Sequence, residues 1–182
     1  MASTTTKEKV LGCLQTIKNN YALTQAGILL LAAENAPDTF EECYAHISGH
    51  PEAQQFAYIK YIFNDYELLK HSSNELRKSV LRNCLKETFE MLKVELVTDE
   101  EKEILLQAPW YRFLRMVRNS LSHDFKFRFR DYDKPKLPVS WSNLTITIEM
   151  DNEFLPMAGF LTRAKVQQLL EEVFEYIRTN IR

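Results

Sequence analysis

An arginine and a histidine five positions apart are the residues of this chain whose types could together do chemistry. They bound the segment 118–123, which reads RNSLSH. A histidine side chain titrates near neutrality, and the planar guanidinium of arginine matches phosphate oxygens. Cleaving RNA without a metal needs a proton acceptor for the 2′-OH, a proton donor for the leaving oxygen and a cation beside the phosphorane. The candidate catalytic residues are therefore Arg118 and His123.

Cationic side chains surround this segment. Residues 110–130 include six lysines and arginines and one acidic residue, Asp124, so that this stretch carries a charge of +5. The rest of the chain carries −7, for a net charge of −2. A basic strip on an acidic body can hold phosphates, but the same charges could equally be solvated faces of amphipathic elements. The candidate RNA-contacting residues are Arg112, Arg115, Ser122, Lys126, Arg128 and Arg130.

The segment 118–123 resembles the R-x(4-6)-H motif of HEPN domains, in which a polar residue usually follows the arginine, as Asn119 does here. The resemblance thus implies Asn119 as a third candidate catalytic residue. The resemblance covers residues from about 76 to 182, with the motif late in a helical bundle and a terminal helix behind it. It implies a metal-independent endoribonuclease of the toxin or antiphage-defence type, which cuts single-stranded RNA to a cyclic phosphate without a cofactor. Some HEPN toxins carry a modified tyrosine two residues after the histidine. Phe125 stands there in this chain, which speaks against that form of control.

Dimerisation follows from the resemblance and from the spacing. On an ideal helix Asn119 and His123 share a face, whereas Arg118 lies about 140° from His123. One copy therefore presents the arginine and the histidine awkwardly unless the helix unwinds near Ser122. HEPN proteins usually dimerise so that two motifs line one cleft, and we expect a homodimer here. An antitoxin or other regulatory protein is a further expected partner.

A non-catalytic interpretation competes with this one. Arg118 could simply pair with an acidic helix, and His123 could cap the helix C-terminus, where a cation favours the helix dipole. The chain would then be a HEPN module for binding or assembly. Trp110 and Trp141 could stack on bases, but such residues more often belong to the core.

Other kinds of site find no support in the sequence. Phosphate-loop, dinucleotide, nucleophile-elbow and zinc-protease motifs are absent. The three cysteines are far apart and the histidines form no ligand pattern, so we expect no disulfide, metal or cofactor. The N-terminus lacks a signal-peptide layout, and the longest apolar run, 26–33, is far shorter than the ~20 residues of a membrane span. These features predict a cytoplasmic protein with no membrane partner.

The elements that must position the candidate residues are mostly helices. The chain contains 4 Gly and 6 Pro, a count that favours long helices with few tight turns. Capping boxes begin at Ser72 and Thr98, and Ser72 marks either a new helix or a bend. Apolar periodicity predicts helices over 7–35, 39–46, 51–70, about 72–96, 98–122 with Pro109 tolerated or kinking, and from Thr162 to the end.

After residue 123 the apolar period changes from 3.6 to 2. Phe125, Phe127 and Phe129 alternate with basic residues, which predicts a strand with one buried and one basic face. Residues 144–150 alternate in the same way and are the expected partner strand. We therefore predict a mostly α fold, a single HEPN-like domain over 1–182. It is an up-down helical bundle with a small antiparallel β hairpin inserted at about 125–155, before the C-terminal helix.

Overall fold

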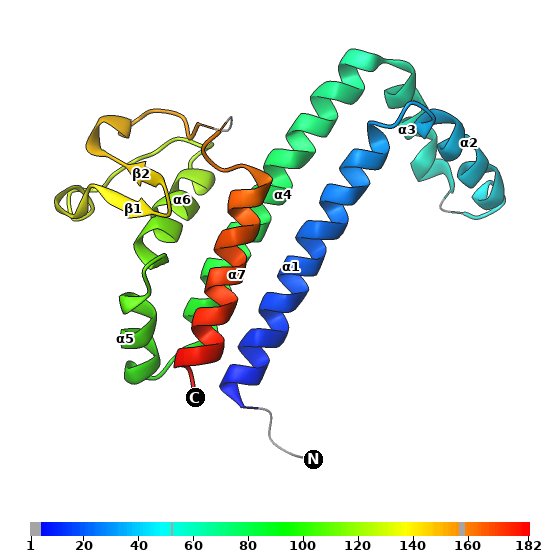
Figure 1. Cartoon of the computed structure of the whole chain (residues 1–182). Coiled ribbons are helices and arrows are strands. Elements are labelled where there is room, and N and C mark those ends of the chain that lie inside the picture. The colour runs from blue at the N-terminus through cyan, green and yellow to red at the C-terminus, as the bar shows by residue number, and fades with distance from the viewer. Residues whose placement is uncertain (1–4, 52, 157–158) are drawn as a thin grey trace. The chain divides into compact units, whose positions relative to one another are not determined.

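The computed structural model describes residues 5–51, 53–156 and 159–182. In this part of the chain, seven α-helices account for most residues, and a two-stranded antiparallel hairpin precedes the last helix (Figure 1). The predicted mostly α fold with a small hairpin is confirmed. The elements are α1 (Thr6–Leu31), α2 (Ala36–Ile47), α3 (Ala53–Asn64), α4 (Tyr66–Glu95), α5 (Asp99–Gln107), α6 (Tyr111–Ser122), β1 (Val139–Trp141), β2 (Leu144–Ile146) and α7 (Arg163–Asn180).

Several helix boundaries differ from the prediction. Helix α1 ends at Leu31 rather than at residue 35, α2 begins at Ala36 rather than at 39, and two further predictions divide the chain in the wrong places. The helix predicted over 51–70 is interrupted at Asp65, whose carboxylate accepts a hydrogen bond from the Leu68 backbone N–H at 3.0 Å. Helix α4 then continues without interruption through residues 72–75, where a new helix or a bend was predicted. The long helix expected over 98–122 is two helices, because Pro109 lacks an N–H and forces the preceding residue out of the helical region. Ala108 is accordingly extended, with φ −61° and ψ 130°.

Two predicted helix starts are confirmed. Thr98 and Glu101 form a capping box, in which each side chain accepts a hydrogen bond from the backbone N–H of the other residue. The Thr162 hydroxyl accepts from the Lys165 backbone N–H and begins α7. Such caps satisfy backbone donors that the first helical turn leaves unpaired.

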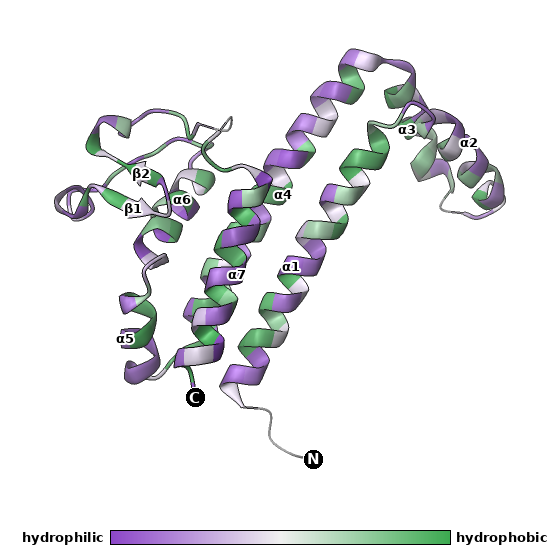
Figure 2. Ribbon diagram, in the orientation of Figure 1, coloured by the Kyte–Doolittle hydropathy of each residue, from purple (hydrophilic) through white to green (hydrophobic). Residues whose placement is uncertain are grey.

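The described residues form two compact units, one comprising the residues up to 20 together with 82–182, and the other comprising 21–81. In the first unit, Lys18 of α1 pairs with Glu171 of α7 at 2.7 Å, and Lys9 of α1 pairs with Glu95 of α4 at 2.7 Å. Apolar and polar bands alternate along α7 (Figure 2). Its buried residues are Val166, Leu169, Leu170, Val173 and Ile177.

The second unit joins α2 and α3 to the adjoining parts of α1 and α4. Phe40 of α2 packs on Phe63 of α3 with ring centroids 5.4 Å apart. Lys60 of α3 pairs with Glu41 of α2 at 2.5 Å. An apolar contact and an ion pair therefore hold these two helices together.

Of the two predicted strands, the second is confirmed over residues 144–146, but its partner is β1 rather than the segment 125–130. Val139 pairs with Ile146 and Trp141 with Leu144, because a two-residue turn with Ser142 at φ 52° closes the hairpin. Residues 148–150, expected as strand, form a short 3-10 helix. The segment 125–130 makes an isolated bridge between Lys126 and Phe154 instead of a ladder with 144–150.

The burial pattern predicted for 125–130 is nevertheless correct. Phe125, Phe127 and Phe129 are buried, while Arg128 and Arg130 are exposed. Backbone hydrogen bonds of this segment run to 152–155, for example from Phe127 N–H to the Glu153 carbonyl at 2.9 Å. Arg128 and Arg130 are therefore available for contacts with a ligand, as predicted, although the segment does not form the predicted strand.

Candidate active site

Helix α6 carries the arginine and the asparagine of the candidate motif on its half-buried side. Its apolar face is buried in the first unit, and the residues on that face are Phe113, Leu114, Met116, Val117 and Leu121. Arg115, Arg118 and Asn119 are intermediate in exposure. Because positions three and four apart share a helix face, burial of the apolar face places these polar side chains together.

His123 lies just beyond the helix, where the chain reverses. It is the C-cap of α6, with φ −119° and ψ 50°, and its side chain is exposed. The next two residues adopt the left-handed conformation, Asp124 at φ 54° and Phe125 at φ 63°. This conformation costs a bulky residue about 1–2 kcal/mol. Burial of the Phe125 ring, with the Arg82 guanidinium 4.9 Å from its centroid, helps to offset that cost.

The reversal allows residues before and after the turn to line one pocket of about 320 Å³, which we call the basic pocket. Five cationic side chains and one carboxylate line it, together with the candidate histidine and asparagine. A concentration of positive charge in a hollow of this size favours an anionic ligand. The lining residues are Phe89, Glu90 and Lys93 from α4, Tyr111, Arg115, Arg118 and Asn119 from α6, and His123, Arg128, Arg130 and Tyr132 from the following segment.

Arg118 is held from three sides. It forms an ion pair with Glu90, its Nη1 donates to Asn119 Oδ1 at 3.2 Å, and its guanidinium lies 6.0 Å from the centre of the Phe89 ring. Arg118 therefore does pair with an acidic residue of another helix, as the non-catalytic interpretation expects. The same contacts fix the direction of the guanidinium at the wall of the basic pocket.

Asp133 and Tyr132 hold two further arginines of the basic pocket in place. Asp133 is 1% exposed and pairs with Arg115 at 3.0 Å. The half-exposed Tyr132 ring has the Arg115 and Arg130 guanidinium carbons 5.5 and 5.9 Å from its centre, and its hydroxyl accepts from Arg130 Nη1 at 3.2 Å. A buried carboxylate and an aromatic ring thus position two cations beside the pocket.

Tyr111 contributes a phenol that stays protonated. Burial raises the pKa of Tyr111 above its usual range, and the nearby positive charge of Arg115 offsets part of that shift. The ring packs on Phe89 with centroids 5.6 Å apart. At neutral pH its hydroxyl is therefore a hydrogen-bond donor within the lining of the basic pocket.

Six of the nine predicted site residues line the basic pocket: Arg115, Arg118, Asn119, His123, Arg128 and Arg130. The other three lie outside its lining. Arg112 lines a separate hollow with Lys136, the Ser122 hydroxyl donates to the Arg118 carbonyl at 3.1 Å, and the Lys126 ammonium lies 4.5 Å from the centre of the Phe154 ring. The two tryptophans are buried, at 1% and 4% exposure, and belong to the core.

Five residues that line the basic pocket were not predicted from the sequence. Phe89, Glu90 and Lys93 come from α4, about 30 positions before the motif, and no spacing in the sequence shows that this turn of α4 faces α6. Tyr111 and Tyr132 were not singled out either. The sequence offers only an indirect indication of Glu90, because an arginine on a half-buried helix face usually has an acidic partner.

Among the described residues, no group of three or more His, Cys, Asp and Glu side chains is placed to hold a metal ion. No helix in the described ranges is both long and apolar enough to span a bilayer. Comparison of the chain with protein-family models, with curated proteins and with solved structures finds no match.

Proposed function

We propose that the basic pocket is the active site of a metal-independent endoribonuclease of the HEPN toxin or antiphage-defence type, which cuts single-stranded RNA. The observation that carries the proposal is the convergence of Arg118, Asn119 and His123 on one strongly cationic pocket. A proton-transfer group and a guanidinium beside a phosphate site are the parts that metal-free RNA cleavage requires.

In the proposed reaction the RNA itself supplies the nucleophile. His123 accepts the proton of the 2′-OH as its oxygen attacks phosphorus, and the bond from phosphorus to the 5′-oxygen of the next nucleotide breaks. The leaving oxygen takes up a proton from the His123 imidazolium, relayed by water, and the products are a 2′,3′-cyclic phosphate and a 5′-OH. Arg118 stabilises the charge that develops on the phosphorane. Asn119 holds Arg118 through its amide oxygen, so we assign it a positioning role.

Three exposed cations of the pocket would hold the RNA backbone, whereas Arg115 is paired with Asp133. Lys93, Arg128 and Arg130 are exposed and line the same hollow from α4 and from the segment after α6. Contacts of this kind bind phosphates without reading the bases, and they make binding depend on salt. We propose that these three residues fix the register of the scissile phosphate against His123.

A homodimer remains a prediction from the resemblance to HEPN domains. The spacing of Arg118 and His123 no longer supports it, because α6 ends at Ser122 and His123 adopts a non-helical conformation. A single chain therefore places Arg118 and His123 in one pocket. An antitoxin or other regulatory protein likewise stays a predicted partner.

One observation favours the alternative, a non-catalytic module for binding or assembly. The ion pair with Glu90 compensates the charge of Arg118 within the chain. In that case Arg118 would join α4 to α6, and the pocket would bind an anion without chemistry.

The test is incubation of the purified protein with mixed RNA in EDTA. We expect the wild type and His71→Ala to degrade RNA equally, and His123→Ala to lose the activity while keeping the wild-type melting temperature. His71 is a matched control because it is also exposed but lies on α4, outside the basic pocket. Absence of cleavage by the wild type, or equal cleavage by His123→Ala, would favour the binding module.

A further inference from the structure

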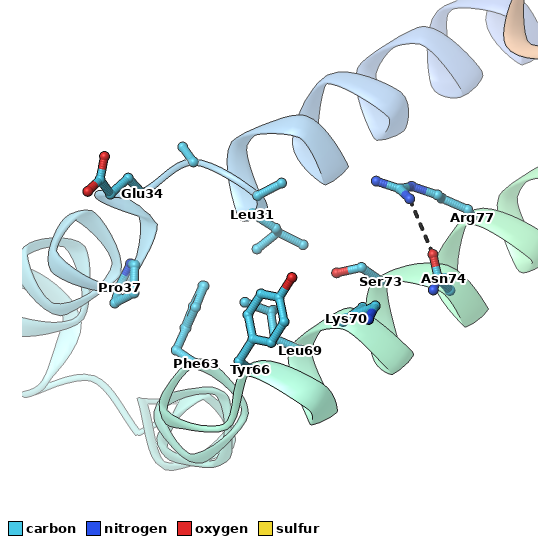
Figure 3. A pocket seen from close by; sticks show the side chains of 12 residues that line it. Leu31, Glu34, Pro37, Phe63, Tyr66, Leu69, Lys70, Ser73, Asn74 and Arg77 are labelled. Atoms are coloured by element: carbon cyan, nitrogen blue, oxygen red, sulfur yellow. Dashed lines mark hydrogen bonds between the residues drawn. The ribbon is translucent and has the colours of Figure 1, made fainter.

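A second hollow, which we call the apolar pocket, lies within the unit formed by residues 21–81. It measures about 400 Å³, a size typical of small-molecule sites. The end of α1, the start of α2, the end of α3 and the first turns of α4 line it (Figure 3). Leu31, Pro37, Phe63 and Leu69 supply an apolar wall, and the Tyr66 ring stands beside them.

The α4 end of the apolar pocket is polar and cationic. Lys70 and Arg77, with Ser73 between them in the sequence, line it at positions that follow one face of the helix. Figure 3 shows the Arg77 guanidinium reaching from α4 toward Leu31. A small molecule in this pocket would therefore meet apolar side chains on one side and positive charge on the other.

Arg77 has donor capacity that the protein does not use. Its Nη1 donates to the neutral Asn74 side-chain oxygen at 3.2 Å. Its Nε is buried without a hydrogen-bond partner in the part of the chain that the structure describes. A buried donor without an acceptor is costly, and an anionic ligand with two oxygens would match the planar guanidinium.

The other charges near the apolar pocket leave its cationic end available. Lys70 contacts Glu67 at 3.8 Å, but this is an exposed pair within one helix, of a kind that contributes little energy. Glu34 is the one carboxylate in the lining, and its side chain points away from Phe63 and Tyr66 in Figure 3. The pocket thus combines an apolar wall with a net positive end.

We propose that the apolar pocket binds a small organic anion, with a flat or aliphatic body against Phe63 and Leu69 and its anionic group on Arg77 and Lys70. The apolar wall supplies affinity through burial, and the guanidinium selects the charged group. This binding is separate from the basic pocket and does not depend on RNA cleavage.

The test uses naphthoate as the probe and naphthalenemethanol, which has the same ring system without the charge, as the matched neutral ligand. Calorimetric titration of the full chain should show one saturable naphthoate site, with the neutral ligand about tenfold weaker, as expected for loss of a charge-assisted hydrogen bond. Arg77→Gln should weaken naphthoate binding by about the same factor. Lys78→Gln should leave it unchanged, since Lys78 is the next residue of α4 but lies outside the lining.

A second variant tests the position of the ligand. Ser73→Phe places a ring in the pocket and should abolish naphthoate binding, with the helical circular-dichroism signal retained. If Ser73→Phe unfolds, the comparison of Arg77→Gln with Lys78→Gln decides. The proposal is overturned by any of three results: no saturable naphthoate binding, equal affinity for the neutral ligand, or binding that survives both Arg77→Gln and a folded Ser73→Phe.

Discussion

Replacing Glu90 with Gln separates the two roles that the structure allows for Arg118. The substitution keeps the size of the side chain and removes the charge that pairs with Arg118. The two side chains are 37% and 26% exposed, so solvent screens the pair. Ion pairs of this kind are worth about 0.2–1 kcal/mol. We therefore expect Glu90→Gln to lower the melting temperature by at most about 2–4 °C for a chain of this length.

Whereas Glu90→Gln should slightly lower stability, it should clearly raise the affinity for RNA. Removing the single carboxylate of the basic pocket leaves its five cationic side chains, and it frees the Arg118 guanidinium for a phosphate. Each additional phosphate contact to a single strand steepens the slope of log K against log salt by about 0.7. Glu90→Gln should thus bind RNA several-fold more tightly at low salt and show a slope steeper by about that amount.

The assay is fluorescence anisotropy of a labelled single strand carrying 2′-deoxy groups, which can bind but cannot be cut, over about 50–200 mM salt. Glu95→Gln is the matched control, because Glu95 also lies on α4 and pairs with Lys9 at 2.7 Å, away from the basic pocket. If Glu90→Gln and Glu95→Gln show the same salt slope as the wild type, Arg118 does not contact phosphate and serves to join α4 to α6.

Arg128 and Arg130 line the basic pocket, whereas Lys126 lies against Phe154 outside its lining. The double variant Arg128→Gln, Arg130→Gln should therefore flatten the salt slope by about 1.4, and Lys126→Gln should leave it unchanged in the same anisotropy titration. The predicted dimer should give twice the chain mass in light scattering at micromolar concentration, and a monomeric mass would contradict it. Burial raises the pKa of Cys84 to about 12 from an ordinary value near 9. The unfolded thiol therefore loses its proton first, and the free energy of unfolding should fall as pH rises from about 9 toward 12, by up to about 1.4 kcal/mol per pH unit. Urea titrations of Cys84→Ala should show a shallower decline over that range, and an identical decline would mean that this thiol does not set it.

The elements whose signals are local could be predicted from the sequence. Thr98 and Thr162 begin helices because their side chains cap the backbone N–H groups three residues later. The alternation of Phe125 to Phe129 correctly predicts which side chains are buried. It does not identify the partner segment, because alternation fixes the face of an extended segment and leaves its pairing open.

The contacts between distant elements could not be predicted. The packing of α4 against α6, which brings Glu90 and Lys93 to the basic pocket, depends on how two amphipathic helices rotate against each other. The left-handed residues Asp124 and Phe125 were also unforeseen, since neither is glycine. That turn places His123 near Arg128 and Arg130. The helix ends at Ser122, which is the exception that the sequence-based prediction left open, so the spacing of Arg118 and His123 no longer requires a dimer. The assignment to HEPN and the extent of the domain stay predictions.

The chemical nature of the cleaved ends tests the central claim most directly. Wild-type protein is incubated with a defined single-stranded RNA in EDTA, and the fragments are analysed by mass spectrometry beside those of His123→Ala and His71→Ala. The proposed mechanism predicts 2′,3′-cyclic phosphate and 5′-OH ends from the wild type and from His71→Ala. For His123→Ala it predicts a loss of rate of about 10²–10⁴. Fragments with 3′-OH and 5′-phosphate ends, or unchanged cleavage by His123→Ala, would contradict it.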